Sequence, residues 1–220
     1  MIAVLALAGA LAGELQFAPD RPGVGDSTLT TGAGHATIEL GLAAALSSEG
    51  TTVSTGGLLG RIGLDDGLEL RLRLPDPFLA DGEPGVGPAG VGAKVGGAIG
   101  DRWSSSVVAE VTVDPNDGTV GGALGANVVA SFDAVGLWLT GAAAGAEAID
   151  VFAGGGIGWG VDEGGLFVNG GHTFGGPSLA GVGGYVLPSP TVQLDATVDF
   201  AFAGDTPFTV LPSVGVAFGL

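Results

Sequence analysis

The segment Leu68–Leu74 reads LELRLRL, with leucine at every second position and a charged residue between each pair. In a β-strand successive side chains point to opposite faces, so one face would be all leucine and the other would carry Glu69, Arg71 and Arg73. A helix of the same sequence would scatter these charges around its whole circumference. The stretch therefore predicts a strand with one apolar face and one charged face.

The same two-residue period recurs along the chain, for example over residues 36–42, 107–113, 192–202 and 214–220. Clusters of Gly, Pro and Asp separate these runs, as is typical of turns. After the first residues, no long stretch has the pattern of a capped amphipathic helix. The runs predict twelve strands, approximately at residues 35–45, 55–64, 68–75, 88–97, 103–113, 119–132, 134–143, 148–160, 165–173, 178–187, 191–202 and 207–220.

The composition excludes several classes of protein. The chain has 220 residues, of which 45 are glycine, 46% are hydrophobic and only 13% are charged, with a formal net charge of −17. It is too hydrophobic for a disordered acidic chain and has too few cations for a nucleic-acid partner. Its apolar runs are too short for membrane-spanning helices, and without cysteine it can form no disulfide or thiolate metal site.

The connections between the predicted strands indicate a membrane barrel. Most acidic residues lie in turns and loops, and most strands carry no charge on either face, so lipid rather than water would cover the apolar face. Trp103, Trp159 and Tyr185 lie near strand ends, where an interfacial aromatic belt is expected. The longest connection, 76–87, lies on one side, and the connections on the other side are short, as periplasmic turns are: 65–67, 98–102, 133, 161–164 and 188–190.

These observations predict an all-β fold: an antiparallel up-and-down transmembrane β-barrel of twelve strands in the bacterial outer membrane, with the lipid bilayer as a partner. A soluble exported β-protein is the alternative. The apolar run from Ile2 to Ala12 is too short to span a bilayer and ends in a small-x-small site, which predicts a signal peptide over residues 1–12. Residues 13–34 would form an N-terminal segment, and residues 35–220 the barrel.

Four of the six cations fall on the polar face of three consecutive predicted strands: Arg61, Arg71, Arg73 and Lys94. If the hairpin around Asp66 is symmetric, Arg61 faces Arg71. If the pairing is shifted by one residue, Arg61 faces Glu69 instead. Like charges directly opposite each other destabilise a sheet, so the symmetric register needs an anion nearby.

That anion could come from Glu39 on the preceding strand, or from Asp20 or Asp26 if the N-terminal segment folds into the lumen. Elsewhere an acidic wall is expected on the lumen face, formed by Asp195, Asp199 and Glu110. Two interpretations of these charges stay open: an internal salt-bridge network that fixes the barrel shape, or a polar constriction that selects solutes.

The sequence predicts no catalytic, cofactor or metal site, and hence no enzyme. The two histidines lie at no metal-ligand spacing from each other, and there is no G-x-S-x-G motif. The glycine pattern at residues 85–90 follows no buried strand and opens no helix, so it lacks the context of a dinucleotide site. A hydrolase that uses His172 and Ser178 is the remaining enzymatic alternative.

Several segments, in this order, resemble a bacterial outer-membrane transporter family that is often labelled by its association with the meta-pathway of phenol degradation. The resemblance extends over roughly residues 19–220. It is carried by Asp20-Arg21-Pro22-Gly23, Asp26-Ser27, Gly34-His35, Glu39, the segments 61–71 and 90–94, and the segment 189–205 with its Asp195 and Asp199.

The resemblance implies a twelve-stranded barrel and passive passage of small, often hydrophobic or aromatic, solutes. The lumen is expected to hold few aromatic residues, unlike an aromatic-binding pocket. The chain ends in Leu220 rather than in the terminal aromatic usual for recognition by the barrel assembly machinery, a further expected partner, although Phe218 keeps the parity. The predicted function is an outer-membrane pore or transporter, and the alternative is a non-conducting structural barrel.

Overall fold

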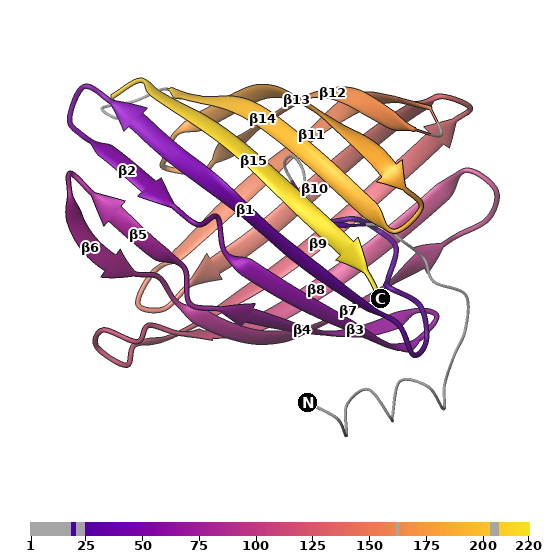
Figure 1. The fold of residues 1–220 in the computed structure, drawn as a ribbon, viewed down its shortest axis with the longest axis horizontal. Coiled ribbons are helices and arrows are strands. Elements are labelled where there is room, and N and C mark those ends of the chain that lie inside the picture. Colours follow the sequence, from indigo (N-terminus) through magenta and orange to yellow (C-terminus); the bar gives the residue numbers. More distant parts are fainter. Residues whose placement is uncertain (1–18, 21–24, 162, 203–206) are drawn as a thin grey trace.

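The chain folds into a closed β-barrel (Figure 1). The computed structural model describes residues 19–20, 25–161, 163–202 and 207–220, and this part contains no helix that could cross a membrane. Its strands are β1 (Ala36–Ser47), β2 (Thr51–Ser54), β3 (Leu58–Asp65), β4 (Leu68–Leu74), β5 (Pro77–Ala80), β6 (Glu83–Val86), β7 (Ala89–Ala98), β8 (Trp103–Val113), β9 (Val120–Phe132), β10 (Val135–Gly145), β11 (Ile149–Val161), β12 (Gly164–Thr173), β13 (Ser178–Ser189), β14 (Val192–Phe202) and β15 (Thr209–Gly219).

Each barrel strand pairs antiparallel with the next one along the chain, and β15 closes the barrel by pairing with β1. The closed ring consists of β1, β3, β4 and β7 to β15, which confirms the predicted twelve-stranded up-and-down barrel. The chain enters β1 and leaves β15 at the same end of the barrel, here called the turn end; the opposite end is called the loop end.

The expected loop at residues 76–87 instead contains β5 and β6, which pair antiparallel. β5 continues β4 toward the loop end, and β6 returns from there and leads into β7. In the same way β2 continues β3, because β1 pairs first with β3 and then with β2. Gly56 and Gly57 lie at the break between β2 and β3 with φ of 68° and 75°, a conformation that favours glycine. Gly and Pro at these breaks resemble turn signals, which is why the sequence pattern missed the continuation.

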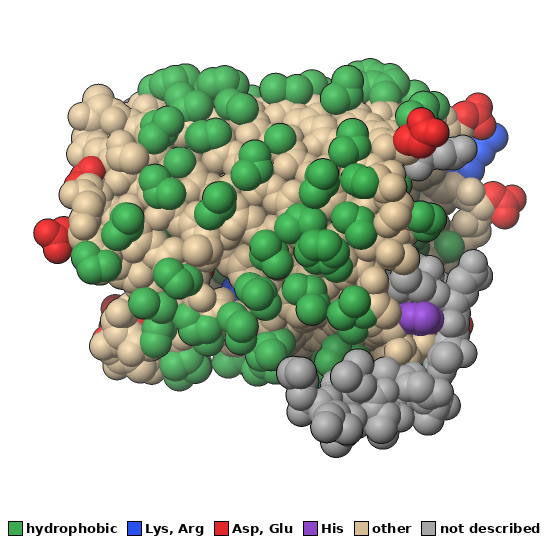
Figure 2. All heavy atoms as spheres, viewed as in Figure 1, with side chains coloured by type: hydrophobic (Ala, Val, Ile, Leu, Met, Phe, Trp, Pro, Cys, Tyr) green, Lys and Arg blue, Asp and Glu red, His purple; other side chains and the backbone are tan. Residues whose placement is uncertain are grey.

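The two faces of the wall are reversed relative to a soluble protein. The largest fully buried side chains are charged and point into the barrel: Arg61, Lys94, Glu39 and Glu69. Leucine and valine point outward, with Leu139 as much as 71% exposed. Figure 2 shows apolar side chains spread over the wall and acidic side chains at its two ends. This arrangement fits lipid around the wall and does not fit the soluble alternative.

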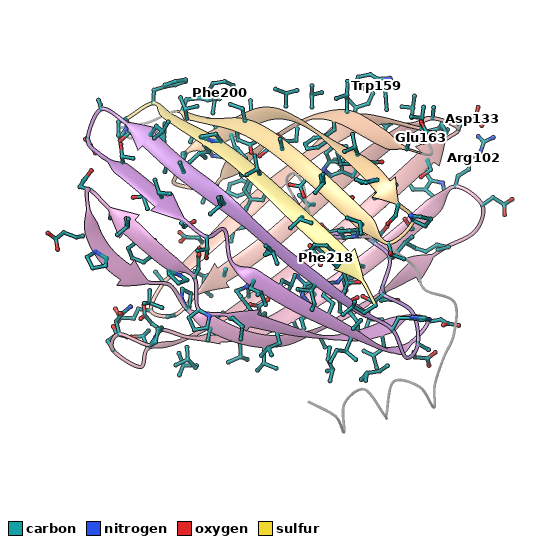
Figure 3. All side chains as sticks on the ribbon, viewed as in Figure 1. Arg102, Asp133, Trp159, Glu163, Phe200 and Phe218 are labelled. Atoms are coloured by element: carbon teal, nitrogen blue, oxygen red, sulfur yellow. The ribbon has the colours of Figure 1, made fainter. Side chains whose placement is uncertain are left out.

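The aromatic belt is present only in part. Trp103 and Trp159 are about half exposed at strand ends, and Trp159 points away from the barrel in Figure 3. Tyr185, which was expected on the same outer face, points into the lumen. Successive residues of a strand face opposite sides, and the exposed, outward residue here is its neighbour Val186. A Cβ on Gly165 would lie 3.0 Å from the Tyr185 hydroxyl, so glycine makes room for this ring inside the barrel.

Candidate functional site

The hairpin of β3 and β4 has the symmetric register, with Arg61 opposite Arg71. Carboxylates separate the two like charges. Arg61 donates to Glu69 (Nε to Oε1, 2.8 Å) and to Glu39 (Nη1 to Oε1, 2.9 Å). Lys94 of β7 lies opposite Glu69 on the other side of β4. The predicted requirement for nearby anions is thus met by side chains of the wall itself and by the N-terminal segment.

Asp20 of the N-terminal segment lies at the centre of this cluster. Its carboxylate forms ion pairs with Arg71, with Lys94 (Nζ to Oδ1, 2.7 Å) and with Arg61 (Nε to Oδ2, 3.6 Å). Its backbone N–H donates to Glu39 (3.0 Å). Burial alone would raise the pKa of Asp20, but the charges of Arg61, Lys94 and Arg71 outweigh it and hold this pKa below its ordinary value.

Asp26 is the second carboxylate that the segment brings to the cluster. It accepts a hydrogen bond from Arg71 (Nη2 to Oδ1, 3.0 Å), and its side chain is 30% exposed, against 5% for Asp20. Burial and the nearby charge of Asp20 raise the pKa of Asp26, and Arg71 only partly opposes them. Asp26 is therefore the more accessible and more easily protonated of the two.

The rest of the described segment lies along the inner wall of the barrel. Thr30 and Thr31 are fully buried, and Thr31 donates its backbone N–H to Glu69 (3.0 Å). Thr28 shares a hydrogen bond with Ser104 of β8. These contacts place residues 25–34 inside the lumen. Arg21 and the predicted signal peptide lie outside the described residues.

Arg73 and Glu110 form a separate ion pair one step toward the loop end (Nε to Oε1, 2.8 Å). Glu110 was expected in an acidic wall with Asp195 and Asp199, and that prediction is wrong. Glu110 lies on β8 and bonds to the basic strand β4, because Gly90 of the intervening β7 leaves space for its carboxylate. Asp195 and Asp199 lie on β14, which β15, β1 and β3 separate from β4.

A cavity of about 550 Å³ lies between the N-terminal segment and the wall formed by β9 to β13. Trp138, Phe167 and Tyr185 line it, together with Asp20 and Asp26. The rings of Trp138 and Phe167 meet edge to face, with centroids 6.0 Å apart and planes at 72°.

The expectation of a lumen with few aromatic residues is thus wrong for this wall. The two-residue period contained the missing signal: Trp138 lies between the outward Leu137 and Leu139, and Phe167 between the outward Leu166 and Val168.

His172 and Ser178 do come together near the loop end, with Nδ1 3.1 Å from Oγ. Within the described residues no carboxylate contacts this imidazole, and its other neighbour is the ring of Phe174. A Ser–His pair acting as nucleophile and base normally relies on a third group that orients the histidine. The described residues also contain no cluster of side chains that could hold a metal ion.

Comparison with known proteins identifies the fold. No protein-family model matches the chain, and no curated protein matches it in sequence. The COG4313 outer membrane channel from Pseudomonas putida F1 is similar with a TM-score of 0.64 at 12% identity, covering 84% of this chain and 94% of that one. The KdgM porin in complex with disordered oligogalacturonate gives 0.62 at 10% identity (82% and 98%), and the NanC porin 0.60 at 7% (82% and 98%). The chain therefore has the fold of the bacterial outer-membrane channel barrels.

Proposed function

We propose that this protein is an outer-membrane channel for passive passage of small solutes, with the N-terminal segment regulating its lumen. The observation that carries the proposal is the charged lumen itself. The largest buried side chains are Arg61, Lys94, Glu39 and Glu69, which line the interior of a barrel whose outside is apolar. A polar interior of this kind is typical of barrels that conduct water and solutes. The barrel assembly machinery is the partner expected for its insertion.

Solutes with an aromatic or other hydrophobic body fit the lumen best. Trp138, Phe167 and Tyr185 form one wall of the cavity, and cavities of 300–1,000 Å³ suit small molecules. The sequence resemblance to the transporter family associated with phenol degradation supports the same class of solute. The acidic rims, part of a net charge of −17, would raise the local concentration of cations at both mouths.

Planar-bilayer recording of Arg71→Ala tests the role of the charged lumen. Wild-type channels are expected to prefer K⁺ over Cl⁻, and removal of one lumenal positive charge should increase that preference as well as the conductance. The reversal potential in a salt gradient measures the change.

Arg102→Ala is the matched control, since Arg102 is exposed in the turn between β7 and β8 (Figure 3). Its guanidinium contacts the ring of Phe132. It removes the same charge from outside the lumen. An Arg71→Ala channel with the selectivity of the wild type would argue against a conducting path beside this cluster.

A further inference from the structure

We propose that the lumen cavity is a binding site for small organic cations, namely solutes that carry an ammonium group on an aromatic or alkyl body. This inference rests on the proposed channel function and specifies the solute class that the channel selects. Three features of the described residues support it: the charges that line the cavity, a buried acceptor without a partner, and the aromatic wall.

Among the described residues, the charges that line the cavity are all of one sign. The described lining residues include the carboxylates of Asp20, Asp26 and Asp133 and contain no Lys or Arg. Among the described lining residues, a solute carboxylate would face these three groups and no cation. An ammonium group would find carboxylates on the side formed by the N-terminal segment, so the lining favours cations over anions.

Within the described residues, the ion-pair cluster beside the cavity has one more carboxylate than cations. Four carboxylates and three cations make it up within the described residues: Asp20, Asp26, Glu39 and Glu69 against Arg61, Arg71 and Lys94. Three of the carboxylates are at most 5% exposed, whereas Asp26 is 30% exposed and lines the cavity. Asp26 is therefore the carboxylate of this cluster that a solute in the cavity can reach.

Asn127 supplies an acceptor that points to the same ligand. The residue is only 4% exposed, and its Nδ2 donates to the Ser106 hydroxyl (3.2 Å), which fixes the orientation of the amide. Its Oδ1 is buried and has no hydrogen-bond partner among the described residues. A buried carbonyl oxygen without a donor is costly. Gly25 of the N-terminal segment lies against this oxygen, so an ammonium N–H would satisfy it once Gly25 shifts aside. Asn127 lines the cavity, as Asp26 does.

The aromatic wall completes the recognition of a cationic solute. Trp138, Phe167 and Tyr185 line the same cavity as Asp26. The faces of aromatic rings attract cations, and Trp gives the strongest such interaction. An aromatic or alkyl body could pack against these rings while the ammonium group reaches Asp26 and Asn127.

Binding of benzylamine to the detergent-solubilised full chain tests the proposal, with benzyl alcohol and benzoate as neutral and anionic probes of similar shape. Calorimetric titration at neutral pH should show saturable binding of benzylamine that is at least about tenfold tighter than that of either other probe. Equal affinity for benzyl alcohol and benzylamine would overturn the proposal.

Variants locate the site. Asp26→Asn, Asn127→Ala and Trp138→Leu should each weaken benzylamine binding by about tenfold, whereas Trp103→Leu, on the outer face, should leave it unchanged. Asn127 and Trp138 lie outside the ion-pair cluster, so they test the site even if Asp26→Asn displaces the N-terminal segment. Unchanged binding in Asn127→Ala and Trp138→Leu would contradict the assignment.

Planar-bilayer recording separates this inference from the proposed function. Conducting channels without preferential benzylamine binding would refute the cation site and leave the channel in place. Inserted barrels that never conduct would refute the channel function, whatever the binding experiment shows.

Discussion

Asp20→Ala is expected to raise the single-channel conductance by releasing the N-terminal segment from the lumen. The substitution removes the carboxylate that pairs with Arg71, Lys94 and Arg61, all of them buried. Removing one partner from a buried ion pair costs about 3–5 kcal/mol. A loss of that size shifts the balance between the docked and released segment by a factor of about 10² to 4 × 10³. Planar-bilayer recording measures the conductance and the fraction of time spent in the larger state.

Acidification gives a second measure of the same contact. Because the pKa of Asp20 is lowered, its stabilising contribution is complete above the ordinary pKa of an aspartate and is lost only as the pH falls through the lowered value. The segment should therefore stay docked at mildly acidic pH in the wild type.

Asp101→Ala, in an exposed turn, is the matched control for Asp20→Ala. If Asp20→Ala and Asp101→Ala conduct alike, Asp20 does not hold the segment.

Gly63→Ala is expected to have a comparable effect on the conductance without removing any charge. A Cβ on Gly63 would overlap with the carbonyl oxygen of Gly32, which belongs to the N-terminal segment. Backbone cannot yield as the end of a flexible side chain can, so the segment must move away from β3. The variant should populate the same larger conductance state as Asp20→Ala, as recorded in the same bilayers.

Gly60→Ala provides the matched control in the same strand. Gly60 points outward, and its added Cβ would come no closer than 3.8 Å to the nearest atom, the carbonyl oxygen of Leu72. That variant should conduct like the wild type. A wild-type conductance in Gly63→Ala would mean that the segment does not occupy the conducting path.

The barrel could be predicted from the sequence because its strands have a strict two-residue period. The pattern of Leu68–Leu74 alone fixed which side of β4 is charged, and the register argument anticipated the anions around Arg61. Such patterns depend only on the geometry of a strand and on what surrounds each face. They can therefore be recognised in the sequence without knowledge of any tertiary contact.

The errors arose where a distant contact or a small residue decides the outcome. Glu110 reaches Arg73 only because Gly90 leaves space on the strand between them, which no local pattern shows. Tyr185 lies near the end of a predicted strand, which suggested an interfacial ring, whereas its parity places it in the lumen. The aromatic wall was not predicted because Trp138 and Phe167 follow the lumen parity among glycines, whereas an interfacial aromatic belt is expected on the outer face.

The most direct test of the channel account is current recording in planar bilayers of two barrels, one complete and one that lacks residues 13–34. If the protein is a channel, both barrels should conduct with a preference for cations, and the conductance should be larger when the segment is absent. A complete barrel that stays silent and conducts only after the deletion would support the non-conducting alternative. Silence of both barrels, with insertion verified, would contradict the account altogether.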